Sequence, residues 1–438
     1  MATVSSQEAV PETNEWTKPP FLRRVRIQGY KSIAFCDVNL QPLTILVGRN
    51  AAGKSNFLDA LAFLRDCMEV GVAEAVKRRG GWSSIVSRTS PHNRIAIEIE
   101  AAFEGWISNV ADASPSQSSP VPLLAHYAIE VTNPPNELPK AVIEKLRISN
   151  PKDESAFILD FDHGKFTFDT QGMKPDSLQW IPPSVKVNIT RLEPFFLRAI
   201  GQQPFVVLGD RLRSMGFYNF HPDAIRALSK PNPGWVLEQD GGNLASVIES
   251  LREIEPESVE RVRDYLRVIV DDVQDFNVVR YGEYETVRFR LRGEDVSSPV
   301  EFDAASMSDG TLRVLAALVA GFQIVLPHGH PSVIGIEEPE AALHPAAMRA
   351  LVDALDEATQ WTQVLLTTHS ADLLSDPDIT PGQVLVVRNR RGQTQITPLG
   401  PASREIVKKE LNSLAELQRM DRLDIDESDL RRQAGLHN

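Results

Sequence analysis

The stretch ILVGRNAAGKSN, residues 45–56, constrains the fold more than any other part of the chain. It starts as a continuous apolar run, typical of a buried strand, and breaks into the spacing Gly48-x-x-x-x-Gly53-Lys54-Ser55. Such glycines let backbone N–H groups point at phosphate oxygens, and a helix that starts near Lys54 adds its positive end. We expect Lys54 to reach the terminal phosphates and the Ser55 hydroxyl to contact a magnesium ion. The residues assigned to nucleotide binding are Gly48, Arg49, Asn50, Ala51, Ala52, Gly53, Lys54, Ser55 and Asn56.

A second apolar strand, in the segment SVIGIEEPE, ends in two carboxylates, Glu337 and Glu338. In an open α/β sheet the carboxyl ends of the strands face the ligand, and phosphoryl transfer needs a carboxylate near the metal and another near the attacking water. We therefore assign Glu337 to hydrated magnesium and Glu338 to the water. The alternative is an acidic strand-to-helix turn in which Glu340 caps the helix.

A third strand, QVLLTTHS, ends in Thr368, His369 and Ser370. A histidine there can donate a hydrogen bond to the terminal phosphate or hold the attacking water, although a single histidine is more often a packing residue. Three strands that deliver Lys54, Glu338 and His369 to one edge favour the functional interpretation. These three residues are the predicted catalytic set.

The remaining patterns predict an α/β fold with a mixed sheet. Short alternating segments between about 93 and 170 predict an antiparallel β subdomain, and a capped helical stretch indicates a lid-like insertion. Helix and strand alternate again near the end, which is the rhythm of a parallel sheet. The predicted parts are a disordered segment 1–20, an N-terminal lobe 21–184, a helical insertion 185–272, a C-terminal lobe 273–400 and a helical tail 401–438.

These strand ends, together with SMSDGTLRVLAAL at 306–318, resemble the ATP-binding-cassette ATPases of the RecF and SMC type, including the ATPase half of OLD-family nucleases. The resemblance covers about 21–65 and 300–390. It implies a P-loop fold of the ABC type, ATP and Mg²⁺ as cofactors, and a head-to-tail dimer. In that dimer Ser308 and Gly310 of one subunit would touch the terminal phosphate held by the other. Taken without the family, the same segment is a serine and aspartate cap before an apolar helix.

The resemblance also has consequences for neighbouring segments. The turn 341–344 would lie at the dimer seam, and residues 30–32 would contact the adenine side of the nucleotide. Asp309 stands where many members of the family have a second glycine. The family's glutamine loop has no match, so the segment RRGGWSSIVSR is expected to replace it.

The composition restricts the compartment and the kinds of partner that we expect for this chain. The net charge of −13 disfavours a broad phosphate-gripping surface, although it leaves a local basic groove open. Two cysteines are too few for a disulfide framework, and neither an export signal nor a long apolar span occurs. We therefore expect a cytoplasmic protein without a membrane partner. No heptads suggest a coiled-coil arm, and the residues after the histidine strand are too few for a nuclease domain.

The leading hypothesis is an ATPase that dimerises around two ATP–Mg²⁺ and controls a separately encoded effector, by analogy in bacterial anti-phage defence. One alternative is a RecF-like DNA repair ATPase, and nucleic acid therefore stays open as a partner. The basic residues considered for a nucleic-acid groove are Arg211, Arg213, Arg388, Arg390 and Arg391. Another alternative is a scaffold that binds ATP and hardly turns it over. A homodimer or a larger homo-oligomer is expected in the leading case.

Overall fold

A computed structural model describes most of the chain. The described residues are 21–89, 93–105, 120–135, 137–152, 155–162, 165–171, 204–232, 236–293, 300–325 and 329–437. The predicted disordered segment 1–20 and the first part of the predicted helical insertion, 185–203, lie outside them. Among the described helices, none combines the length and the apolarity that crossing a lipid bilayer requires.

A seven-stranded antiparallel sheet forms the N-terminal lobe, as the alternating patterns predict. Along its strands inward and outward positions alternate, so that one face packs on the core and the other meets water. The strand order is β2-β1-β4-β5-β6-β7-β8. The strands are β1 (Leu22–Tyr30), β2 (Ile33–Asn39), β4 (Arg94–Gly105), β5 (Val121–Thr132), β6 (Lys140–Ser149), β7 (Ala156–Asp162) and β8 (Lys165–Gln171).

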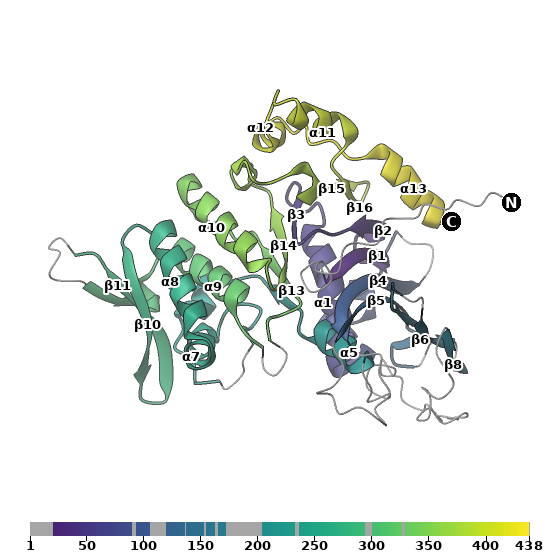
Figure 1. Ribbon diagram of the computed structural model, residues 1–438, viewed down its shortest axis with the longest axis horizontal. Helices are drawn as coiled ribbons and strands as arrows, with labels where there is room; N and C mark the ends of the chain where they lie inside the picture. The colour runs from purple at the N-terminus through teal and green to yellow at the C-terminus, as the bar shows by residue number, and fades with distance from the viewer. Residues whose placement is uncertain are drawn as a thin grey trace.

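A six-stranded mixed sheet carries the three strand ends of interest (Figure 1). Its order is β16-β15-β3-β14-β13-β9, and all neighbouring pairs are parallel except β15 and β16. β14 therefore lies between the strand before the glycine loop and the strand that ends in the glutamates. The strands are β3 (Leu43–Val47), β9 (Gly216–Tyr218), β13 (Val333–Glu337), β14 (Gln363–Thr368), β15 (Val384–Arg390) and β16 (Gln393–Pro398).

Helix α1 (Lys54–Val70) belongs to the core between the two sheets. Its apolar side chains, among them Phe57, Leu61 and Phe63, share one buried cluster with β1, β4 and β5 and with Leu365 of the mixed sheet. Burial of this many apolar side chains is the main favourable term for the lobe. Smaller helices complete this side of the molecule: α2 (Val72–Arg78), α3 (Trp82–Ile85) and α5 (Phe205–Arg213).

A helical layer covers the opposite face of the mixed sheet. It consists of α7 (Leu244–Ile254), α8 (Pro256–Ile269), α9 (Asp309–Phe322) and α10 (Pro345–Ala358), which share a second buried cluster with β3, β13 and β14. Beyond it extends a small antiparallel sheet of β10 (Val273–Tyr281), β11 (Tyr284–Leu291) and β12 (Val300–Asp303) (Figure 1). The helices expected in the insertion thus pack directly on α9 and α10.

Short helices connect these layers and end the chain. They are α6 (Pro222–Arg226), η2 (Ala304–Ser306), η3 (Leu373–Ser375), η4 (Pro381–Gln383), α11 (Pro401–Lys408), α12 (Leu414–Arg419) and α13 (Glu427–His437). Helix α13 returns to the N-terminal lobe, where Arg432 binds the buried carboxylate of Asp37 on β2. The last helix therefore ties the end of the described chain to its first strands.

Candidate nucleotide-binding site

The loop 48–53 connects β3 to α1. Neighbouring atoms lie so close to its two glycines that neither position has room for a Cβ atom. A Cβ atom on Gly48 would lie 2.2 Å from the carbonyl oxygen of Val387 on β15. Gly53 has a φ of +107°, and a Cβ atom there would lie 2.0 Å from Oγ1 of Thr394 on β16. Any larger residue would displace the loop, because backbone and β-branched atoms already fill the space.

Lys54 curls back over this loop. Its Nζ donates hydrogen bonds to the carbonyl oxygens of Gly48, at 2.9 Å, and Arg49, at 3.2 Å. Burial lowers the pKa of Lys54, whereas the nearby carboxylates of Glu338, Glu340 and Glu337 act in the opposite direction. Lys54 as a whole is only 5% exposed, and its amine lies near three acidic groups and above the loop that would receive the phosphates.

Ser55 and Glu337 meet across the gap between α1 and β13. The Ser55 hydroxyl donates a hydrogen bond to Oε2 of Glu337. Burial raises the pKa of Glu337, and the hydroxyl bond partly offsets that effect. One hydroxyl and one carboxylate oxygen are hard ligands of the kind that Mg²⁺ prefers, so this pair fits the metal expected there.

Glu338 and His369 form the next pair along the same edge. Nδ1 of His369 lies 3.0 Å from Oε1 of Glu338. Glu338 has a φ of +44°, an unusual backbone conformation for a residue other than glycine, and its N–H donates to the carbonyl oxygen of Thr367 at 3.0 Å. A strained backbone conformation persists only where the surrounding structure holds it in place, and such conformations are concentrated at functional sites.

Glu340 has a different role from the helix cap considered from sequence. Its side chain is buried, and Oε1 accepts a hydrogen bond from the Thr368 hydroxyl at the end of β14. Oε2 is buried without a hydrogen-bond partner in the described structure. Burial raises the pKa of Glu340, and the Thr368 bond opposes this. The residue links the acidic turn to the histidine strand.

Ser308 and Gly310 lie at the start of α9. The Ser308 side chain accepts a hydrogen bond from the N–H of Thr311, so it caps the helix. A Cβ atom on Gly310 would lie 2.4 Å from the carbonyl oxygen of Ala342, in the turn 341–344. Asp309 forms an ion pair with Arg226. These contacts join the start of α9 to the turn 341–344 and to α6.

Thr394 was not predicted from sequence. Its Oγ1 contacts Oγ of Ser32 at 2.7 Å and donates to the carbonyl oxygen of Ala52 at 2.9 Å. Ser32 also accepts a hydrogen bond from the side chain of Asn56. The β1–β2 turn, the glycine loop and β16 are therefore joined by hydroxyl groups. A lone threonine more than 300 positions away leaves no local pattern that could reveal this.

Asp59 of α1 also went unrecognised. Its carboxylate binds Lys31 at 2.6 Å, Arg79 at 3.0 Å and the hydroxyl of Tyr30 at 2.6 Å. Burial disfavours the charged form, but Arg79 and Lys31 outweigh it and lower the pKa of Asp59. Tyr30 is fully buried with its hydroxyl on Asp59, so its ring is not free to stack on a base. Asp59 lies four residues after Ser55, so on a predicted helix the two side chains share a face. That spacing was the signal in the sequence that could have placed Asp59 near the site.

Most of the basic residues considered for a nucleic-acid groove are engaged in the fold. Burial lowers the pKa of Arg211, Arg213 pairs with Asp210, and Arg388 donates to the carbonyl oxygen of Leu423 at 2.8 Å. Arg390 and Arg391 lie at the exposed β15–β16 turn. A continuous basic groove is not formed by this set.

The chain is similar in sequence to two known domain families. The family described as "AAA ATPase domain" matches residues 21–158, and the family described as "AAA domain, putative AbiEii toxin, Type IV TA system" matches residues 237–376. No curated protein matches the chain in sequence.

Similar solved structures include SMC heads. An SMC head bound to the C-winged helix domain of ScpA is 13% identical, with a TM-score of 0.48 over 88% of this chain and 99% of that chain. The SMC head domain from Thermotoga maritima is 12% identical, with a TM-score of 0.38 over 86% and 98%. An SMC head from Pyrococcus furiosus, with an extended coiled coil and bound to the C-terminal domain of ScpA, is 13% identical, with a TM-score of 0.43 over 89% and 99%.

The two matched segments, 21–158 and 237–376, contribute strands that lie side by side in one mixed sheet. The glycine loop follows β3 from the first matched segment, and the acidic pair follows β13 from the second. Both matched families are AAA domains, so the chain is an ATPase of the AAA type.

Proposed function

We propose that residues 48–56 bind ATP and that Ser55 and Glu337 hold its Mg²⁺. The observation that carries this proposal is the convergence of three strand ends, because β14 pairs with both β3 and β13. Magnesium, when bound, would neutralise charge on the phosphate oxygens. Lys54 would turn from the loop carbonyls to the terminal phosphates, and Glu338 would accept a proton from the attacking water. His369 would orient Glu338.

In this proposal two copies of the chain close head to tail around two ATP molecules. The first turn of α9 presents backbone N–H groups beside Ser308, and a helix N-terminus favours an anion. Among the described residues no hydrogen bond joins those groups to residues 48–56, which leaves them available to a phosphate of a second copy. Close packing of Gly310 on Ala342 supports coupling between this helix start and the turn at the proposed seam.

The proposed output is control of a separately encoded effector in bacterial anti-phage defence. The description of the family that matches residues 237–376 names a "putative AbiEii toxin" of a type IV toxin–antitoxin system. This description favours a function in which the chain acts together with a separately encoded protein. The cytoplasmic location inferred from sequence stays a prediction. Purification together with the products of neighbouring genes, followed by identification of what co-elutes, tests the effector.

The Glu338→Gln variant tests the ATPase proposal. We expect it to bind ATP, to lose about 10²-fold or more in turnover, and to elute as an ATP-dependent dimer in size-exclusion chromatography with light scattering. Lys54→Ala is the matched control, and it should stay monomeric with ATP. Unchanged turnover in Glu338→Gln would remove Glu338 from this role, and negligible turnover in the unmodified protein would favour the ATP-stabilised scaffold. Salt-sensitive DNA binding that tightens with ATP would favour the RecF-like alternative.

A further inference from the structure

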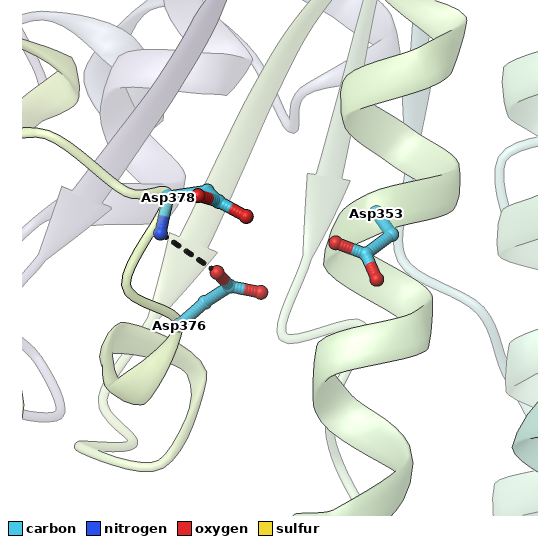
Figure 2. A group of neighbouring side chains, drawn as sticks. All are labelled: Asp353, Asp376 and Asp378. Carbon is cyan, nitrogen blue, oxygen red and sulfur yellow. Dashed lines mark hydrogen bonds between the residues drawn. The ribbon is translucent and has the colours of Figure 1, made fainter.

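Three aspartates from two separate segments meet on the helical side of the mixed sheet. Asp353 lies on α10, and Asp376 and Asp378 lie in the loop after η3 (Figure 2). One carboxylate oxygen from each lies within 4.8 Å of the others. None of the three belongs to the candidate nucleotide site, so the chemistry described above leaves the cluster without a use.

Asp376 is the buried member of the group, with only 5% of its surface exposed. Its Oδ1 accepts a hydrogen bond from the N–H of Asp378 at 2.9 Å. Its Oδ2 is buried and has no hydrogen-bond partner in the described structure. Figure 2 shows this second oxygen turned toward the space in front of Asp353. A buried carboxylate oxygen without a partner is costly, so a positive ligand at this point would satisfy it.

The protein supplies little positive charge here. Arg349, one turn before Asp353 on α10, lies 3.9 Å from Asp378, and both side chains of that pair are mostly exposed. Asp356 adds a further carboxylate on the same helix. Burial raises the pKa of Asp353, and the charges of Asp376 and Asp378 add to this effect against the opposing charge of Arg349. Several carboxylates thus lie near a single positive side chain, Arg349, whose charge is partly screened by solvent.

We propose that Asp353, Asp376 and Asp378 bind a hard divalent cation, and that Ca²⁺ fits the site better than Mg²⁺. Carboxylate oxygens are the ligands that both ions take, and the exposed side of the cluster gives water access to the remaining positions. Calcium accepts six to eight oxygen ligands at about 2.3–2.6 Å in flexible geometry, whereas magnesium requires about 2.1 Å in near-ideal octahedral geometry.

The bound ion would join two segments that begin at the nucleotide site. Helix α10 follows directly on the acidic turn 338–344, and the loop that carries Asp376 and Asp378 follows His369. The helix and η3 already lie in contact. An ion between them would brace the helix after the glutamates against the loop after the histidine. It would stabilise the folded protein by binding it in preference to the unfolded chain.

Calcium binding to the full-length protein tests this proposal, after chelator treatment and without nucleotide or magnesium. Isothermal titration calorimetry should detect a Ca²⁺ site that Asp376→Asn weakens at least tenfold, and Ca²⁺ should raise the thermal unfolding midpoint of the unmodified protein more than that of Asp376→Asn. Because Asp376 is buried, Asp353→Asn provides a second variant at an exposed position and should weaken binding similarly. Asp264→Asn, a largely exposed aspartate of α8 outside the cluster, is the matched control and should bind Ca²⁺ normally.

The same titration separates this site from the candidate magnesium site. A Glu337→Gln variant should keep the calcium signal, because Glu337 takes no part in the cluster. Mg²⁺ should bind more weakly than Ca²⁺, and equal or tighter Mg²⁺ binding would overturn the assignment of calcium. The absence of binding by either ion at concentrations of about 1 mM, or binding that survives both Asp353→Asn and Asp376→Asn, would overturn the site itself.

Discussion

Nδ1 of His369 lies 3.0 Å from Oε1 of Glu338, and the two residues follow neighbouring parallel strands. Glu338 stands at a positive φ, with its N–H bonded to β14, the strand that ends just before His369. The histidine strand therefore fixes both the backbone and the side chain of the glutamate. In the proposed mechanism, this contact would let His369 position Glu338 as the base.

Replacement of His369 by alanine should lower turnover more than ATP binding. Without its imidazole partner, Glu338 loses the contact that orients it toward a water, and general-base catalysis is worth about 10²–10⁴-fold. We expect a fall in kcat of about 10²-fold with an ATP Kd changed by less than about threefold. His126→Ala, on β5 of the antiparallel sheet, is the control and should leave kcat unchanged. An equal loss in binding and turnover would point to a structural role instead.

Replacement of Gly310 by alanine tests the contact between α9 and the turn 341–344. The added Cβ would lie 2.4 Å from the Ala342 carbonyl oxygen, so one of the two segments must move. Such overpacking typically lowers the free energy of unfolding by about 1–3 kcal/mol. Denaturant unfolding measures this loss, and Gly435→Ala, on helix α13 with open space around it, is a control for loss of a helical glycine. Equal stability of Gly310→Ala and the unmodified protein would contradict the packing described here.

Asp37 should make stability sensitive to acid. Burial opposes its charge, but Arg24, Arg26 and Arg432 outweigh burial and lower the pKa of its carboxyl. For a carboxyl with a lowered folded pKa, the stabilisation is fully present above the unfolded pKa of about 3.9 and is lost as the pH falls through the folded value. Asp37→Asn should therefore cost about 3 kcal/mol of unfolding free energy at pH 7 and less below pH ~3.9.

Denaturant unfolding at two pH values checks this expectation for Asp37. The difference between the unmodified protein and Asp37→Asn should shrink on acidification. Asp264→Asn, which removes a largely exposed partner of Arg267, is the control and should change stability by less than about 1 kcal/mol. A constant difference at both pH values would show that the ionised form of Asp37 is not what stabilises the fold.

The parts of the site that lie at strand ends could be predicted from the sequence. β3, β13 and β14 are short apolar runs followed at once by polar groups, and parallel strands bring such ends to one edge. Their order in the sheet, with β14 in the middle, agrees with that expectation. The strands of the antiparallel lobe could also be predicted, because the alternation of apolar and polar residues is a local signal.

Contacts between distant segments could not be predicted in this way. Thr394 fills the space beside Gly53, Arg432 binds Asp37, and Asp353 lies beside Asp376. None of these pairs belongs to a local spacing or a periodic pattern, so they depend on how whole elements pack. A contact outside the helix also occupies Asn243, which directly precedes α7: its Oδ1 accepts from the N–H of Glu238 and does not cap the helix.

A mixing experiment tests whether two copies complete one site. Lys54→Ala lacks its own phosphate contact, and Ser308→Arg blocks the helix start offered to the partner, so each variant alone should be inactive. In an equal mixture, a heterodimer pairs the intact loop of one chain with the intact Ser308 of the other, and ATPase activity should return to about a quarter of the unmodified level. Full activity of Ser308→Arg alone, or no recovery on mixing, would contradict a nucleotide site shared between two subunits.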